Sequence, residues 1–539
     1  ACWPTANNNP DPVQCSMGNA MSNTVEWVAT CGASANRDVL VVIDPISTGA
    51  VLASQAVERG LAIIAVWSES VPDELKGYVD KRLSLRYIGV VQHVEGKLEA
   101  TARAVRAISG ERLKGVLVGC ETGVLLGDAL AEELGQRGNG TKLSPLRRNK
   151  WLQTEAVRES GANACIQSLV TGTSQVERVL KGWPMTSGAF KAVVKPCEGA
   201  GSDGVTICNS KQDVRDAFLK LDGTRNVLGL TTYEVLVQEY LVGEEYVVDT
   251  VSRDGVHKCV AIWKYDKRIF NGSPVVYYGM RFLAIDDEPE LQAMVDYTLG
   301  VLETLGIENG CMHSEIKLEP RGPVLIEVNC RVHGGEGTWA PMAESCCGYS
   351  AVSALLDAYF APDAFAALPA LPGATGLNAF AMEAKLRSQV EGTLDKIDQQ
   401  KMGRIRALKS YQDEMIAVEV GRPISKTIDA VTACGNVNLV HEDARQLDAD
   451  YATFHEIVES GLFRVKAVAS TTAKPSNASL ASYMAQSPPS SPQVQAFKSF
   501  TPSPPSTRFI LNVNEPNGNG AIPHRARVSS SLKPERMSS

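Results

Sequence analysis

Apolar runs of strand length alternate with helix-like patterns in the first part of the chain. Two of these runs, 39–43 and 61–66, flank a helix pattern over 50–59, and a run at 115–119 opens a second copy. Strands that alternate with helices predict a parallel sheet covered by helices. We therefore expect an N-terminal parallel α/β domain over residues 37–143.

The pattern becomes mixed after that domain. Ser144 before Pro145 is a typical helix start and Gly161 a typical helix end, which predicts one helix between them. Strands and short helices then alternate irregularly as far as residue 365. A smaller α+β domain follows over 366–470, with strands expected at 415–420 and 436–440.

The two ends of the chain have a different composition. Residues 1–36 are rich in Asn, Pro and Ser, which predicts a flexible leader. Residues 471–539 are rich in Pro and Ser and carry a basic excess, which predicts a disordered tail that buries no core. The tail is open to two interpretations, a phosphorylated or docking segment or an inert solvated extension.

Charge and composition narrow the classes of partner. A formal net charge of -8 with a pI near 5.6 argues against binding to nucleic acid or to an anionic membrane, because both require a basic face. Apolar runs are too short for a membrane span, and the 13 cysteines are scattered without a C-x-x-C spacing. These features predict a cytoplasmic protein with reduced thiols and small-molecule partners, and a homodimer remains open.

A glycine loop follows the apolar strand that ends at Lys195. Gly199, Gly201 and Gly204 match the dinucleotide fingerprint G-x-G-x-x-G, but the loop leads into a strand at 205–208 rather than into a helix. No Gly-Lys-Ser/Thr follows, which excludes a P-loop. A β-hairpin flap whose backbone N–H groups fold over phosphates remains, and a plain glycine hairpin is the alternative.

Residues 235–249 form a strand, a short linker and a second strand. Such a hinge can offer backbone groups to the edge of an adenine. Glu245 follows the linker and can accept hydrogen bonds from ribose hydroxyls.

Two alternating strands further on carry acidic residues. The segments 314–319 and 324–329 are joined by the turn 320–323, and folding that hairpin sets Glu315 opposite Glu327. The two-residue period puts Asn329 on the same face as Glu327. Two facing carboxylates repel unless a cation lies between them, and an all-oxygen ligand set suits Mg²⁺.

The order of the two lysines, the glycine loop, the hinge and the Glu327-x-Asn329-x-Arg331 motif resembles the ATP-grasp superfamily of carboxylate–amine ligases. The basic segment 262–268 followed by 271–274 resembles its L-amino-acid (dipeptide) ligase branch. This resemblance covers roughly residues 38–466 and is strongest between 144 and 340. It implies an ATP-grasp domain over 144–365, with the flap at about 190–245.

The resemblance also implies roles for individual residues. For the nucleotide these are Lys150, Lys195, Glu198, Gly199, Gly201, Gly204, Gln238, Glu239, Tyr240, Leu241 and Glu245. The metal ligands would be Glu315, Glu327 and Asn329, holding two Mg²⁺ ions, with Mn²⁺ as an alternative. Catalytic roles would fall to Arg331, Lys195, Lys267 and Arg268, and Lys264 would help to steer phosphates. Together they imply an ATP-dependent ligase that forms an amide or peptide bond through an acyl phosphate and releases ADP and phosphate.

The sequence is also compatible with two other functions. A biotin-carboxylase-like or purine-pathway enzyme shares the fold, although the flap lacks the basic, glycine-denser loop of biotin carboxylases. A non-catalytic ATP-binding regulator similar to synapsins would also pair such a body with a Pro/Ser-rich tail. His313 and His333 are open as well, either as groups that contact phosphate or substrate or as structural histidines.

Overall fold

The computed structural model describes residues 27–29, 36–73, 76, 87–184, 188–199, 203–225 and 231–466. The predicted tail at 471–539, most of the predicted leader and Gly201 of the glycine loop lie outside the described residues. At 27–29 the chain is a strand, β1, paired with β4, rather than a loose leader.

The N-terminal sheet has the predicted parallel topology. Its order is β1-β4-β3-β2-β5, and β2, β3, β4 and β5 pair in parallel while β1 is antiparallel. The strands are β1 (Trp27–Ala29), β2 (Val39–Ile43), β3 (Ala62–Trp67), β4 (Gly89–Gln92) and β5 (Leu113–Val118). The helices are α1 (Thr48–Glu58), α3 (Leu98–Ser109) and α4 (Val124–Glu133). Every residue of β2 and β3 is buried, as expected for strands covered on both faces.

The predicted helix between Ser144 and Gly161 is wrong in its start. Residues Ser144–Arg147 form a short 3-10 helix, and the α-helix α5 (Lys150–Glu159) begins separately. Asn149 is its N-cap, because its side chain accepts hydrogen bonds from the N–H groups of Trp151 and Leu152. An asparagine cap inside the segment therefore overrides the Ser-Pro start, and Lys150 becomes the first residue of α5.

A four-stranded antiparallel sheet in the order β6-β9-β7-β8 carries the glycine loop. Its elements are β6 (Gln167–Val170), α6 (Thr173–Lys181), β7 (Ala192–Pro196), β8 (Thr206–Cys208), α7 (Lys211–Leu221) and β9 (Val235–Glu239). Val194 and Val237 face the apolar core shared with α6 and α7. Strand alternation therefore places Lys195 and Gln238 on the opposite face.

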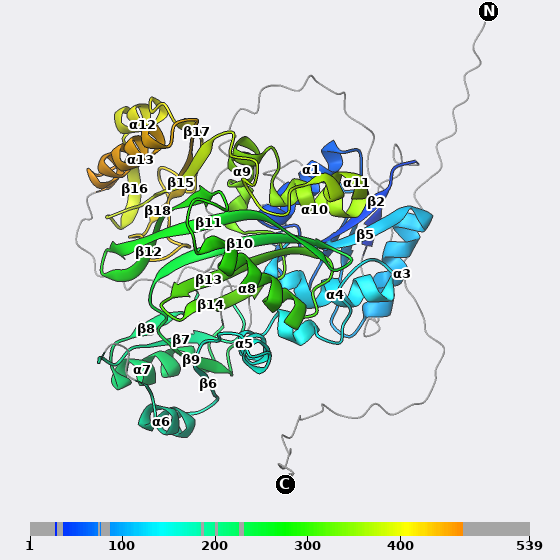
Figure 1. Cartoon of the computed structure of the whole chain (residues 1–539), viewed down its shortest axis with the longest axis horizontal. Helices are drawn as coiled ribbons and strands as arrows, with labels where there is room; N and C mark the ends of the chain where they lie inside the picture. Colours follow the sequence, from blue (N-terminus) through cyan, green and yellow to red (C-terminus); the bar gives the residue numbers. More distant parts are fainter. Residues whose placement is uncertain are drawn as a thin grey trace, which may run out of the picture. The chain divides into compact units, whose positions relative to one another are not determined.

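A long antiparallel sheet forms the centre of the described chain, in the order β14-β13-β10-β11-β12-β15-β19-β17. Its first five strands are β10 (Glu244–Arg253), β11 (Val256–Phe270), β12 (Ser273–Leu283), β13 (Gly310–Glu319) and β14 (Gly322–Asn329). Helix α8 (Leu291–Thr304) packs on one face, where Figure 1 shows it along β13 and β14. Helices α9 (Ala340–Cys347), α10 (Ala351–Phe360) and α11 (Pro362–Ala367) cover apolar residues of the other face.

The C-terminal strands extend the same sheet past residue 365. They are β15 (Phe380–Leu386), β17 (Tyr411–Ile416) and β19 (Gly435–His441), and β15 pairs directly with β12. A small sheet of β16 (Gly392–Ile397), β18 (Pro423–Ile424) and β20 (Phe463–Val465) and the helices α12 (Gln399–Arg406) and α13 (Ala444–Glu459) complete this part. The predicted boundary at 365 thus crosses a continuous sheet, and it remains a prediction. Among the described helices, none combines the length and apolarity needed to cross a membrane.

Candidate active site

The acidic hairpin folds in the predicted register. Strands β13 and β14 are antiparallel, with Glu315 opposite Glu327 and His313 opposite Asn329. A β-bulge follows Glu315, so the regular alternation ends there. The Asn329 amide donates to Glu327 Oε1 at 3.2 Å, which holds the two side chains together.

Two lysines from the neighbouring elements face this hairpin. Lys150 Nζ lies 2.9 Å from Glu327 Oε2, and it also donates to the carbonyl of Gly199 at 3.1 Å. Lys195, only 6% exposed, lies near the same carboxylate. The first turn of α5, the end of β7 and the acidic hairpin therefore meet in one place.

Burial and charge shift the pKa values in this cluster in opposite directions. Burial raises the pKa of Glu327, but Lys150 and Lys195 outweigh that effect and lower the pKa to about 2. Burial lowers the pKa of Lys195, and the nearby Lys150 lowers it further against the attraction of Glu327. Glu327 is thus ionised at neutral pH and is available as a ligand or counter-charge.

Arg331 closes the other side of the cluster. Its Nη2 donates to the Asn329 side-chain oxygen at 3.2 Å, and its Nε lies 3.2 Å from Glu121 Oε2. Glu121 is buried just past the carboxyl end of β5, and its other oxygen lies 3.5 Å from Arg148 Nη1. The N-terminal sheet thus contributes a carboxylate to the same site.

The predicted glycine-loop residues occupy mixed positions. The Glu198 carboxylate lies 3.9 Å from Arg148 Nη2, so its side chain is paired with a cation and, being an anion itself, is unsuited to contact a phosphate directly. Gly204 has φ of +73°, and a Cβ there would lie 2.8 Å from Leu221 Cδ2, so glycine is required for the turn. The carbonyl of Gly199 is the Lys150 acceptor.

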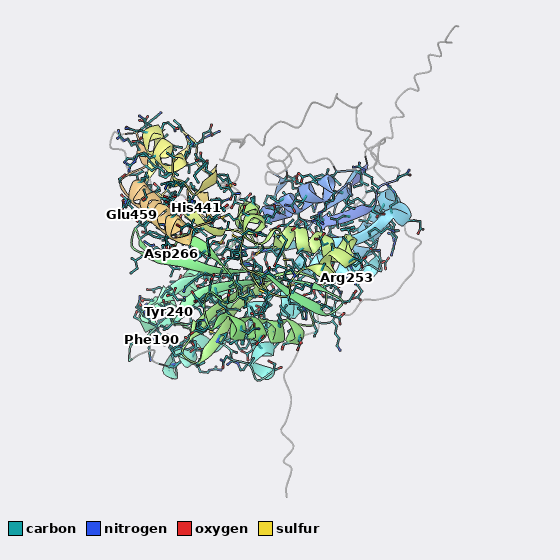
Figure 2. All side chains as sticks on the ribbon, turned by 45° about the horizontal axis from the view of Figure 1, so that its top comes forward. Phe190, Tyr240, Arg253, Asp266, His441 and Glu459 are labelled. Atoms are coloured by element: carbon teal, nitrogen blue, oxygen red, sulfur yellow. The ribbon has the colours of Figure 1, made fainter. Side chains whose placement is uncertain are left out.

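The predicted adenine hinge is a strand, a linker and a strand, β9 and β10. The Gln238 side chain donates to Gln167 at 2.8 Å, and the Glu239 carboxylate accepts from the Ile166 N–H and pairs with Arg321. These side chains are therefore engaged within the protein, which leaves a nucleotide role to the backbone near Leu241. Tyr240, labelled in Figure 2, is half-buried under a cation–π contact from Lys191 at 4.5 Å.

The predicted ribose ligand Glu245 lies beside two lysines. Its carboxylate forms a short ion pair with Lys267 and lies 3.5 Å from Lys317. Lys267 also lies over the rings of Tyr265 and Tyr277, at 4.8 and 4.2 Å. Burial lowers the pKa of Lys267, but Tyr277 and Glu245 reverse the shift and raise it, so Lys267 is a buried cation near the hairpin.

The structure does not support the prediction that Arg268 is catalytic. Arg268 follows Lys267 on β11, and its guanidinium pairs with Asp266 at 2.6 Å and lies over the Tyr278 ring at 4.5 Å. Asp266, which is labelled in Figure 2, in turn accepts a hydrogen bond from Tyr451 of α13. Strand alternation separates Arg268 from Lys267 and directs it to the C-terminal helix.

Lys264, which the sequence predicted to help steer phosphates, is also directed elsewhere. Its Nζ donates to Glu288 at 2.8 Å and lies 5.1 Å from the centre of the Tyr246 ring. Tyr246 belongs to the apolar face that α8 covers. Lys264 therefore lies on the side of the sheet away from the acidic pair.

Both histidines belong to a buried network around Asp249. The Asp249 carboxylate bonds to His313 Nδ1 at 2.9 Å and His333 Nδ1 at 3.1 Å, and it accepts from the Trp263 indole at 3.0 Å. These interactions lower the pKa of Asp249 despite its burial. Although ligand atoms of Asp249, His313 and His333 lie within 4.8 Å of one another, as in a metal cluster, the carboxylate is already satisfied by donors. The structural interpretation of the histidines therefore fits best.

His313 also connects this network to the acidic pair. Its Nε2 lies 3.3 Å from Glu315 Oε1. Burial lowers the pKa of His313, but the hydrogen bonds to Asp249 and Glu315 raise it to about 9. A largely protonated imidazole thus donates to both carboxylates and orients Glu315.

Sequence reasoning missed Glu121, Arg148 and Asp249. Glu121 had a usable signal, because it follows a buried parallel strand at the carboxyl edge where α/β sheets bind ligands. Arg148 lies two residues before Lys150, but a basic residue at that spacing carries no pattern of its own. Asp249 looked like the end of an apolar strand, and only the register of β10 with β13 places it opposite His313.

The hairpin residues fit a divalent metal. Glu315 and Glu327 offer carboxylate oxygens and Asn329 offers its amide oxygen, and hard cations such as Mg²⁺ prefer oxygen ligands. Glu327 Oε2 is buried, and although Lys150 is close to it, the contact lacks hydrogen-bond geometry. A buried carboxylate oxygen with an open valence is suited to a metal ion.

Cations that face an all-oxygen ligand set are typical of enzymes that activate a carboxylate or transfer a phosphoryl group. A family model described as an ATP-grasp domain matches residues 189–339. Dapdiamide A synthase of Enterobacter agglomerans is 32% identical over 335 residues, which cover 61% of this chain and 75% of that protein. Alanine–anticapsin ligase of Bacillus subtilis (strain 168) is 27% identical over 38% of this chain and 45% of that protein. The L-amino acid ligase of Bacillus licheniformis has a similar fold, with a TM-score of 0.61, 17% identity and coverage of 80% of this chain and 99% of that one.

The chain therefore belongs to the ATP-grasp ligases, a family of carbon–nitrogen bond-forming enzymes that use ATP and divalent metal ions. The predicted family, the α/β fold class and the ligase activity are confirmed. The roles of single residues stay predictions.

Proposed function

We propose that this protein is an ATP-dependent ligase that joins the carboxylate of one amino-acid-like substrate to the amine of another through an acyl phosphate. The observation that carries the proposal is the meeting of Lys150, Glu327, Asn329 and Arg331 at one site, linked by contacts of 2.9–3.2 Å. The two relatives compared by sequence support the substrate class, since one is named for a ligation in which alanine takes part.

The first step transfers a phosphoryl group. A carboxylate oxygen of the substrate attacks the γ-phosphorus of ATP, an oxygen–phosphorus bond forms, and the bond to the β–γ bridging oxygen breaks, so ADP leaves with the electron pair. Lys150 and Lys195 neutralise the charge on the transferred oxygens. Divalent metal held by Glu315, Glu327 and Asn329 would supply further neutralisation of phosphate charge.

The second step forms the amide. The amine nitrogen attacks the acyl carbon, the carbon–oxygen bond to phosphate breaks, and the proton that the nitrogen loses passes to the departing phosphate. Arg331 is proposed to contact the acyl phosphate, because the fork of a guanidinium group matches its oxygens.

Several finer predictions accompany this proposal. Two Mg²⁺ ions, with Mn²⁺ as an alternative, are proposed for the metal site. The cysteines that the structure describes are free thiols, which supports the predicted reducing, cytoplasmic compartment. The homodimer and the domain boundaries at 143 and 365 also remain proposals.

Amino-acid-dependent ADP release tests the proposal. Purified protein is incubated with MgATP and pairs of amino acids, and ADP and phosphate are measured against a reaction without amino acids. The proposal predicts equal release of ADP and phosphate only when a suitable pair is present. ADP release that depends on bicarbonate alone would favour the carboxylating alternative, and ATP binding without turnover in any mixture would favour the regulator.

A further inference from the structure

Arg148 is a buried cation whose terminal nitrogens lack hydrogen bonds. The residue is 6% exposed, and both Nη1 and Nη2 are buried without a hydrogen-bond partner among the described residues. Its neighbour Arg147 is equally buried but donates to Asp128 at 3.0 Å and to the Leu305 carbonyl at 3.0 Å. A buried donor without an acceptor is costly, so the contrast indicates that Arg148 is kept for a ligand.

Carboxylates lie near Arg148 without satisfying it. Glu121 Oε1 is 3.5 Å from Nη1 and Glu198 Oε2 is 3.9 Å from Nη2, which are ion-pair distances but not hydrogen bonds. Glu121 is shared with Arg331, 3.2 Å away. One buried carboxylate thus lies between two guanidinium groups.

The contacts of Arg148 belong to a closed circuit of residues. Arg331 donates a hydrogen bond to the Asn329 side-chain oxygen, and the Asn329 amide donates to Glu327. Glu327 pairs with Lys150, which donates to Gly199, the neighbour of Glu198 in the chain. Because Glu198 forms an ion pair with Arg148, the Arg148 guanidinium belongs to the same circuit as the proposed nucleotide lysine and metal ligands.

The net charge of this circuit becomes positive when the metal ligands hold a cation. Before then, the cations Arg148, Arg331 and Lys150 are balanced by Glu121, Glu198 and Glu327. A divalent cation on Glu327 more than cancels that carboxylate, which leaves an excess of positive charge that calls for an anion. An arginine with two free terminal nitrogens fits a phosphate, because its fork binds two oxygens at once.

We propose that Arg148 binds the transferred phosphoryl group, with Arg331 on the other side of Glu121 and Glu121 fixing the two guanidinium groups. Arg148 stays charged throughout and exchanges no proton, and it contacts the same group as γ-phosphate, acyl phosphate and released phosphate. Glu198, on the glycine loop, occupies the Arg148 guanidinium until the phosphoryl group replaces it. This inference rests on the proposed function, whose phosphate it assigns to a particular side chain.

Inorganic phosphate is the probe for the test. Binding of phosphate to the full-length protein saturated with MgADP is measured by calorimetry for wild type, Arg148→Met and Arg148→Lys. We expect Arg148→Met to weaken phosphate about 10- to 100-fold while MgADP affinity changes less than about 3-fold. Arg148→Lys keeps the charge but loses the fork, and its affinity should be intermediate. The matched control is Arg158→Met, further along α5, where the arginine pairs with Glu155 and phosphate affinity should not change.

The opposite variant probes Glu198. Replacing the competing carboxylate in Glu198→Gln should strengthen phosphate binding by about 2- to 5-fold. Thermal unfolding of each variant shows whether it folds. If Arg148→Met does not fold, the phosphate affinity of Arg148→Lys tests the inference instead.

Three results would overturn the inference. These are phosphate affinity unchanged in Arg148→Met, an equal loss of MgADP and phosphate affinity in that variant, and no phosphate binding to the wild-type MgADP complex. Amino-acid-dependent ADP release in the wild type would leave the proposed function standing in each of these cases. If the wild type shows no amino-acid-dependent ADP release, both the proposed function and this inference fail.

Discussion

The two polar networks beside the acidic hairpin differ in how completely they are hydrogen-bonded. Around Asp249, each carboxylate oxygen has a donor from His313, His333 or Trp263. Around Glu327 and Arg148, buried nitrogens and oxygens lie near opposite charges without hydrogen-bond geometry. A satisfied buried network makes the fold rigid, whereas an unsatisfied one costs stability unless a ligand completes it. We therefore propose a structural role for Asp249 and a ligand-binding role for the circuit through Arg148 and Glu327.

Removing the carboxylate of the open network should have the largest effect. Glu327→Gln should lower amino-acid-dependent ADP release by about 1,000-fold, because it removes a metal ligand and charge complementarity at the transferred phosphate. Steady-state ADP release measures the effect, and circular dichroism checks the fold. Glu303→Gln, an exposed acid on α8, is the control. Equal activity in Glu327→Gln would remove the metal-site assignment.

The closed network should respond in stability instead. Asp249→Asn leaves the His313 and His333 rings without a carboxylate and should lower the free energy of unfolding by about 2–4 kcal/mol. Urea unfolding measures the change, and Asp395→Asn on the exposed side of β16 should shift it by less than about 0.5 kcal/mol. Unchanged stability together with lost activity would reverse the comparison.

The buried lysine of the open network should act on nucleotide binding. Lys195→Met should weaken MgATP binding by about 10- to 100-fold through loss of a charged donor to phosphate. It should leave stability unchanged or improved, because burial already lowers the pKa of this lysine. Calorimetric titration with MgATP measures the affinity, with Lys211→Met at the exposed start of α7 as the control. Unaltered affinity would place Lys195 outside the nucleotide site.

Asp413 is a half-buried carboxylate with one side-chain donor, and its effect on stability should depend on pH. Burial raises the pKa of Asp413 to about 6, with Asn438 donating to it at 2.7 Å. Between the ordinary value near 3.8 and about 6, the folded state holds a proton that the unfolded state has lost, so wild-type stability should fall as pH rises through this window.

The matched variant removes that titration. Asp413→Asn should gain about 2 kcal/mol over wild type between pH 4 and pH 7.5, measured by urea unfolding at both values. A pH-independent difference would mean that Asp413 titrates alike in both states.

The elements that the sequence predicted best rest on local patterns. Uninterrupted apolar runs predicted the parallel strands β2, β3 and β5, and folding the hairpin about its turn placed Glu315 opposite Glu327. Two-residue alternation in a strand also distinguishes Lys267 from Arg268, because neighbouring strand residues point to opposite faces.

The remaining features depend on contacts between distant segments. Glu121 and Arg148 become neighbours only when the edge of the N-terminal sheet meets the start of α5. Asp249 acquires its histidines from β13 and from the loop after β14. The start of α5 differs from the prediction for a local reason. Asn149 caps the helix, so α5 begins at Lys150 and not directly after Ser144-Pro145.

Transfer of an isotope label tests the acyl phosphate most directly. An amino acid labelled with ¹⁸O in its carboxylate is ligated with MgATP, and the released phosphate is analysed by mass spectrometry. Since the attacking carboxylate oxygen becomes the bridge that departs with phosphorus, one ¹⁸O atom per phosphate is the predicted result. Phosphate that carries only unlabelled oxygen would contradict an acyl phosphate and, with it, the account of this site.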